Sequence, residues 1–145
     1  MSIDPGDSAV ATPDSASDPA PRLTPEDTQR IIALAMDFAR EGRTEDLMEF
    51  IDHGLPVDTL DHEANTPLML AAYHGHQETV TALLARGADV DARNTRDQSI
   101  VAGAMFKGED AIVRQLIEAG ADLDVGTPTA RQAAVLFGRE HLLAD

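Results

Sequence analysis

Residues 66–92 read TPLMLAAYHGHQETVTALLARGADVDA, and their pattern decides the fold expected for the chain. Thr66 is a favourable N-cap residue, and Pro67 at the first helical position gives up a backbone donor that has no partner inside a helix. Apolar side chains then recur at spacings of three and four residues, as on the buried face of a helix. The stretch therefore predicts two short helices that are joined by a turn at Gly75 and ended at Gly87.

The same pattern returns on both sides of this stretch. Two series of glycines each repeat at steps of 33 residues: Gly42, Gly75 and Gly108, and Gly54, Gly87 and Gly120. A fixed period of this size is typical of a solenoid, in which each unit buries its apolar face only by stacking on its neighbours. Residues 99–124 follow the pattern with Gly103 inside the first helix, which costs about 0.5–1 kcal/mol relative to alanine. Residues 33–58 follow it more loosely.

This pattern resembles the ankyrin repeat family, whose unit is a β-turn finger, a helix, a turn, a second helix and a return loop. The residues that carry the resemblance are Thr66-Pro67-Leu68, Ala71-Ala72, Gly75-His76, Leu83-Leu84 and Gly87-Ala88-Asp89-Val90. The resemblance implies an all-α ankyrin-repeat solenoid of about four stacked helix-turn-helix units with β-turn fingers. It also implies that the terminal units act as caps, that His76 makes hydrogen bonds in the inter-helix turn, and that Asp89 and Asp122 brace the finger backbone.

The chain is expected to have two parts. Residues 1–24 are rich in Ser, Pro, Asp and Ala, which predicts a disordered acidic tail. The ankyrin repeat domain is expected over residues 25–145. Its repeats are placed at about 25–58, 59–91, 92–124 and 125–145.

Both ends of the repeat domain depart from the regular pattern. A longer first helix is expected over residues 25–40, with a buried stripe of Ile31, Ile32, Leu34, Ala35 and Phe38. Gly138 falls three residues early in the 33-residue register, which predicts a shortened last finger.

The composition of the chain excludes several classes of function. A chain of 145 residues suits one domain, and its net charge of −15 argues against a nucleic-acid reader, which needs clustered Lys and Arg. The absence of cysteine excludes disulfides and thiolate chemistry. The first residues lack the basic and apolar regions of a secretory signal, and no run approaches about 20 apolar residues, so a cytoplasmic protein without a membrane anchor is expected.

The sequence offers no catalytic or metal-binding motif. His62, His74 and His76 form its densest histidine group, but their spacing is not that of a zinc helix. The finger carboxylates lack the glycine and glutamate of a calcium loop, and neither a nucleophile elbow nor a phosphate loop is present. We therefore expect no enzyme, no cofactor and no metal.

What remains is a surface for recognition. The resemblance implies that partners contact the finger tips and the exposed side of each first helix, which form the concave face. Carried over by register, this face comprises Leu60, His62, Glu63, Asn65, Met69, Tyr73, His74, Arg93, Thr95, Arg96, Gln98, Phe106 and Lys107. Tyr73 and Phe106 lie one period apart, so two rings are expected side by side as anchors; packing of Phe106 in the core is the alternative.

Charges alternate between neighbouring fingers. Asp61 and Glu63 belong to one finger, and Arg93 and Arg96 belong to the next. Neutralisation between the fingers and a partner of mixed charge are both compatible with this pattern, because exposed ion pairs contribute little on their own.

Two functions follow from these observations. The first is a non-catalytic scaffold whose concave surface binds a protein partner of unknown identity, with the chain itself a monomer. The alternative is an acidic regulator or immunity-type inhibitor that neutralises a basic enzyme, since an acidic surface steers basic partners.

Overall fold

The computed structural model describes residues 23–143 of the chain. Most of the expected tail, up to residue 22, lies outside these residues. The chain divides between Arg30 and Ile31 into two units, which are described separately. The helices are α1 (Pro25–Glu41), α2 (Thr44–Asp52), α3 (Pro67–Tyr73), α4 (Gln77–Ala85), α5 (Ile100–Lys107), α6 (Asp110–Glu118), α7 (Ala130–Leu136) and the 3-10 helix η1 (Glu140–Leu143). No strand forms within residues 23–143, so the predicted all-α class is confirmed.

The described part of the first unit contains the start of α1. The backbone N–H of Asp27 donates to Thr24 Oγ1 at 3.0 Å, and the N–H of Thr24 donates to an Asp27 carboxylate oxygen at 3.3 Å. Thr24 therefore caps the helix and Pro25 begins it, as the sequence predicts.

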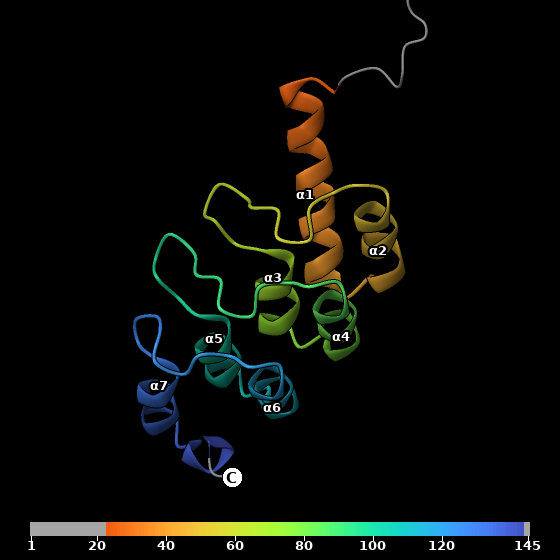
Figure 1. The fold of residues 1–145 in the computed structure, drawn as a ribbon. Coiled ribbons are helices and arrows are strands. Elements are labelled where there is room, and N and C mark those ends of the chain that lie inside the picture. Colours follow the sequence, from red (N-terminus) through yellow and green to blue (C-terminus); the bar gives the residue numbers. More distant parts are fainter. Residues whose placement is uncertain (1–22, 144–145) are drawn as a thin grey trace, which may run out of the picture. The chain divides into compact units, whose positions relative to one another are not determined.

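The second unit, from Ile31 onward, is a stack of helix pairs in two columns (Figure 1). Helices α3, α5 and α7 pack in one column, and α2, α4, α6 and η1 pack in the other. We call these the inner and outer columns. Long loops, the fingers, connect each outer helix to the next inner one. The fingers at residues 53–66 and 86–99 are equal in length, whereas the finger at residues 119–129 is three residues shorter, as predicted.

The inner helices share one kind of start. Thr66 Oγ1 accepts a hydrogen bond from the N–H of Met69, and Ser99 Oγ accepts one from the N–H of Ala102, both at 3.2 Å. Thr129 starts α7 with a full capping box. Ser99 therefore caps the N-terminus of α5 as Thr66 caps that of α3, although the third repeat lacks the Thr-Pro-Leu sequence.

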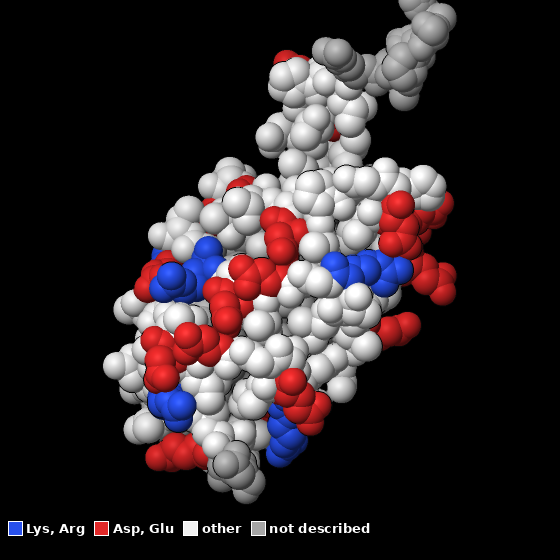
Figure 2. Space-filling view, viewed as in Figure 1, with Lys and Arg blue, Asp and Glu red and all other residues white. Residues whose placement is uncertain are grey.

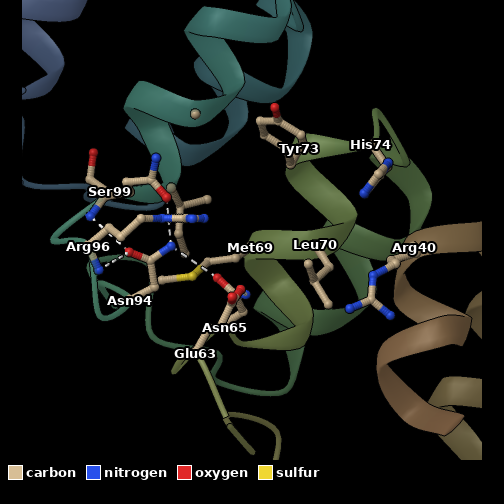
Figure 3. Close-up of a pocket in the computed structure, with 13 residues that line it drawn as sticks. Arg40, Glu63, Asn65, Met69, Leu70, Tyr73, His74, Asn94, Arg96 and Ser99 are labelled. Atoms are coloured by element: carbon tan, nitrogen blue, oxygen red, sulfur yellow. Dashed lines mark hydrogen bonds between the residues drawn. The ribbon is translucent and has the colours of Figure 1, made fainter. Parts of the chain in front are cut away.

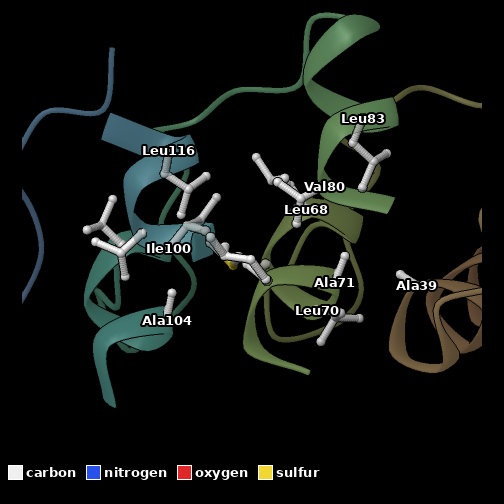
Figure 4. Packing of buried hydrophobic residues seen from close by; sticks show 14 of the residues in the cluster. Ala39, Leu68, Leu70, Ala71, Val80, Leu83, Ile100, Ala104 and Leu116 are labelled. Atoms are coloured by element: carbon white, nitrogen blue, oxygen red, sulfur yellow. The ribbon is translucent and has the colours of Figure 1, made fainter. Parts of the chain in front are cut away.

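The core runs through both columns (Figure 4). Apolar side chains at three- and four-residue spacing on the outer helices supply large core residues, of which Leu47, Val80, Leu83, Val113 and Leu116 are fully buried. Small side chains line the inner helices: Ala71, Ala72, Ala104, Ala133 and Ala134 are at most 1% exposed. Because alanine lets backbones approach closely, this pattern allows each inner helix to pack tightly on the next.

One residue of the predicted stripe in α1 was assigned wrongly. Leu34 is 44% exposed, whereas Ala35 and Phe38 are buried. Each helical residue turns the side chain by about 100°, and this step takes Leu34 off the arc that holds Ala35, Met36, Phe38 and Ala39.

The first glycine series marks the turns between paired helices. Gly42 has a φ of +72°, and a Cβ there would lie 2.4 Å from the ring of His76. Its counterparts are likewise covered by the turn residue of the next repeat, Gly75 by Glu109 and Gly108 by Arg139. The period thus records a contact between successive repeats as well as a backbone conformation.

Aspartates brace the finger bases, as expected for Asp89 and Asp122. Asp89 accepts from the N–H of Asp91 and Asp122 from that of Asp124, both at 2.9 Å. An aspartate also links successive repeats, because the Asp91 carboxylate accepts from the N–H of Asp122 at 2.7 Å.

Candidate functional site

A hollow of about 310 Å³ lies where the fingers meet the inner helices of the second and third repeats (Figure 3). Its floor is formed by the apolar side chains of Met69, Leu70 and Ile100, which are nearly buried. Gly103 leaves room beside them, and a Cβ at this position would lie 3.6 Å from the ring of Tyr73. A side chain from another molecule would therefore meet an apolar base with an aromatic wall.

The finger side of the hollow is held by amides. Asn94 Nδ2 donates to Asn65 Oδ1 at 3.0 Å and to Gln98 Oε1 at 2.8 Å. Asn94 Oδ1 accepts from the backbone N–H groups of Arg96 and Gln98. These bonds tie two neighbouring fingers together and fix the backbone from which Arg96 extends.

Positive charge collects around the hollow. Arg40 and Arg96 lie on opposite sides of it, with Met69 and Leu70 between them (Figure 3). Arg40 bonds Asp37 at 2.9 Å, whereas Arg96 forms no ion pair within residues 23–143. The ammonium of Lys107 lies 4.9 Å from the centre of the Tyr73 ring. A cation over an aromatic face is a favourable contact, and it places Lys107 at the rim.

The pKa of His74 is affected by burial and by the positive charges around the hollow. Partial burial lowers it from its ordinary value of 6.5, and the positive charges of Lys107, His76 and Arg40 lower it further. The imidazole of His74 therefore holds its proton less readily at the edge of the hollow.

A row of exposed apolar side chains continues along the inner column beyond the hollow. Phe106 is 60% exposed, and its ring meets that of Phe137 edge-on at a centroid distance of 5.5 Å. Val135 and Leu136, which precede Phe137 in the chain, are 64% and 67% exposed. Phe106 is thus a surface residue, which decides the question that the sequence left open.

The predicted concave residues divide into three groups, of which Phe106 and Lys107 on α5, described above, are one. Seven of them line the hollow: Glu63, Asn65, Met69, Tyr73, His74, Arg96 and Gln98. Met69 is 8% exposed and so forms the floor, contrary to its predicted role as a freely exposed contact. Leu60, His62, Arg93 and Thr95 are exposed on the fingers without lining the hollow.

Each of the two expected anchor rings has another partner. Phe106 packs against Phe137, and the ring of Tyr73 faces the ammonium of Lys107. Their role as anchors stays a prediction. Arg93 bonds Asp97 of its own finger at 3.0 Å, because the turn brings that carboxylate closer than the acids of the preceding finger.

Comparison with known proteins identifies the repeat. Residues 64–95, which contain α3 and α4, match the family model described as ankyrin repeat. These residues are an ankyrin repeat. The stacked pairs and fingers are therefore an ankyrin solenoid. The hollow lies on the face that the fingers and inner helices form. We call this whole face, from the hollow to Phe106 and Phe137, the ankyrin groove.

The relatives share only part of their length with this ankyrin chain. An ankyrin repeat protein of Pseudomonas aeruginosa is 40% identical over 62 residues, which cover 43% of this chain and 36% of the relative. An E3 ubiquitin-protein ligase of Oryza sativa is 42% identical over 71 residues, or 48% of this chain and 15% of the ligase. An acyl-CoA-binding domain-containing protein of Arabidopsis thaliana is 45% identical over 47 residues, or 32% and 14% of the two chains.

The ankyrin register could have found residues that the sequence analysis missed. Arg40 lies one period before Tyr73, and Asn94 one period after Asp61. Leu136 corresponds to Phe106 once the short last finger is allowed for: the N–H of Arg139 bonds the oxygen of Ala134 as that of Glu109 bonds Ala104. Leu70, Ser99, Ile100 and Gly103 also line the groove, and only the stacking of the repeats reveals them.

Two kinds of feature are absent from the described ankyrin repeats. Within residues 23–143, His, Asp and Glu form no group of three that is arranged to hold a metal ion. In the same range, every helix is too short or too polar to cross a membrane.

Proposed function

We propose that this chain is a non-catalytic scaffold that binds a partner protein in the ankyrin groove. Ankyrin repeats generally mediate protein–protein interaction. The observation that carries the proposal is the hollow of about 310 Å³, which combines an apolar floor with polar finger groups. Such a combination is typical of recognition sites, where the apolar base gives affinity and a few polar groups give orientation.

The exposed row beyond the hollow supports the same function. Phe106, Leu136 and Phe137 are exposed on the inner column, and Phe106 directly precedes Lys107, which contacts Tyr73. Aromatic side chains dominate the energy of many interfaces, so this row would enlarge the contact beyond the hollow.

The experiment is affinity capture with two matched double variants. Tyr73→Ser with Arg96→Ala alters the groove, whereas Gln77→Ala with Arg114→Ala alters exposed residues of the outer helices. We expect the groove variant to lose the proteins that the native chain captures and the outer variant to retain them. Thermal unfolding of both variants should stay close to that of the native chain. Equal capture by both would refute the groove as the binding surface.

An acidic regulator of a basic enzyme is the second candidate. Its support is the net charge of −15 and the spread of Asp and Glu over the face seen in Figure 2, where Lys and Arg form separate spots. Capture at low and high salt separates the candidates, because a partner held by charge alone is lost as ionic strength rises. The cytoplasmic location and the monomeric state stay predictions.

A further inference from the structure

We propose that the ankyrin groove selects an extended acidic segment of its partner, with a carboxylate in the hollow and a large apolar side chain on Phe106 and Phe137. This inference rests on the proposed function and names the chemistry of the ligand. It also reverses the expectation from net charge, which favours basic partners.

The first support is the local sign of the charge. The groups that border the hollow include Arg40 and Arg96, with Lys107 at the rim, against the carboxylate of Glu63. In a chain of net charge −15, this is a cationic site inside an acidic surface. A carboxylate placed there gains attraction from several groups at once, whereas a basic side chain would have Glu63 alone.

The second support is that two of the three cations, Arg96 and Lys107, have no carboxylate partner within residues 23–143, whereas Arg40 bonds Asp37. Asn94 fixes the backbone of Arg96, and the guanidinium forms no ion pair within residues 23–143. Lys107 rests on the Tyr73 ring instead of on a carboxylate. A guanidinium without a carboxylate partner is suited to a charge-assisted, bidentate bond with an incoming acid.

The third support is the order of features along the inner column. The cations surround α3, and the exposed pair of Phe106 and Phe137 follows at α5 and the end of α7. Packed helices lie about 8–10 Å apart, so this offset is about 8–20 Å. At about 3.3 Å per residue, an extended segment would cover it in roughly three to six residues.

The test is selection from a displayed library of random 12-residue peptides on the native chain and on Arg96→Glu. We expect peptides enriched on the native chain to carry Asp or Glu about three to six positions from a large apolar residue. On Arg96→Glu the acidic position should be lost or replaced by Lys or Arg. Native-chain peptides that are basic, that lack this spacing, or that fail to enrich at all would overturn the inference.

Affinity of one enriched peptide then tests the contact directly. Arg96→Ala should weaken binding by about fivefold or more, and replacing the peptide's acid by its amide should add little further loss in that variant. The control is Arg93→Ala, which removes a finger arginine that is bonded to Asp97 and does not line the hollow; it should change affinity less than twofold. Equal losses in Arg96→Ala and Arg93→Ala would contradict the proposed contact.

The two proposals fail in different ways. Basic peptides that still depend on Tyr73 and Phe106 would remove the acidic preference and leave the groove as a binding surface. Partner capture that is indifferent to Tyr73 and Arg96 would remove the proposed function itself.

Discussion

His76 Nε2 lies 2.6 Å from the backbone carbonyl oxygen of Arg40, which joins the second repeat to the C-terminal end of α1. The bond requires the ring to carry its proton on Nε2. The same ring covers Gly42, so that a hydrogen bond and a close backbone approach occur at one place. The expectation that His76 serves the turn is confirmed, and its partner proves to belong to the preceding repeat.

This contact predicts a coupling between His76 and Gly42. Gly42→Ala should destabilise the fold more than Gly87→Ala, because both glycines have positive φ but only at Gly42 would a Cβ meet another group. The conformational penalty alone is about 1–2 kcal/mol. His76→Ala should cost about 1 kcal/mol for its hydrogen bond. In denaturant unfolding, the double variant Gly42→Ala with His76→Ala should lose less stability than the two single losses added together; simple additivity would contradict the contact.

Ala64 predicts a gain in stability. Its φ of +63° lies in the left-handed region, where an L-residue other than glycine is strained. Ala64→Gly should therefore raise the free energy of unfolding by about 0.5–1 kcal/mol. The matched control is Ala111→Gly, an exposed position in α6, which should lower it by a similar amount. A loss of stability in Ala64→Gly would show that the finger does not hold this conformation in solution.

Gly103 predicts opposite effects on stability and binding. It lies inside α5, and a Cβ there would touch Tyr73 at an ordinary contact distance of 3.6 Å. Gly103→Ala should therefore stabilise the fold by about 0.5–1 kcal/mol, because alanine is the better helix former. The added methyl group narrows the hollow, so affinity for a groove-bound peptide should fall. Calorimetry and a binding titration on the same variant check both; tighter binding would show that the ligand does not reach Gly103.

Acid sensitivity is predicted at Asp61. Partial burial raises the pKa of this carboxyl, but the hydrogen bonds from Asn65 and Glu63 outweigh it, and the pKa lies below its ordinary value of 3.8. Because the folded state lowers the pKa, the contribution to stability is present above pH 3.8 and is lost as the pH falls through the folded value. The free energy of unfolding of the native chain should therefore fall as the pH is lowered below about 3.8.

The next repeat supplies the matched variant for Asp61. At the corresponding position, Asn94 makes the same two bonds to backbone N–H groups without a carboxylate. Asp61→Asn should keep the turn and lose less stability between about pH 5 and 2.5 than the native chain. Glu118→Gln, which removes an exposed charge from α6, controls for the change in net charge. Equal acid sensitivity in all three chains would exclude Asp61 as the source.

Local signals decided most of the fold. The starts of α1 and α3, the turn at Gly75 and the shortened last finger follow from caps, positive-φ glycines and spacing, each of which acts within a few residues. The 33-residue period then assigned side chains to faces, because every repeat folds in the same way. The exposure of Leu34 was not predicted, because its place just outside the buried arc of α1 depends on how that helix is rotated against its neighbours.

The sequence by itself determined the ankyrin repeat, the helices and the 33-residue register, since these depend on periodic patterns along the chain. Only the tertiary structure decided what each side chain of that face meets. Arg40 and Arg96 are separated by two repeats in the chain and come to opposite sides of one hollow through stacking. The pairing of Phe106 with Phe137 likewise depends on how the last, shortened repeat settles on its neighbour. Such contacts depend on the separation and rotation of whole layers, which no local pattern specifies.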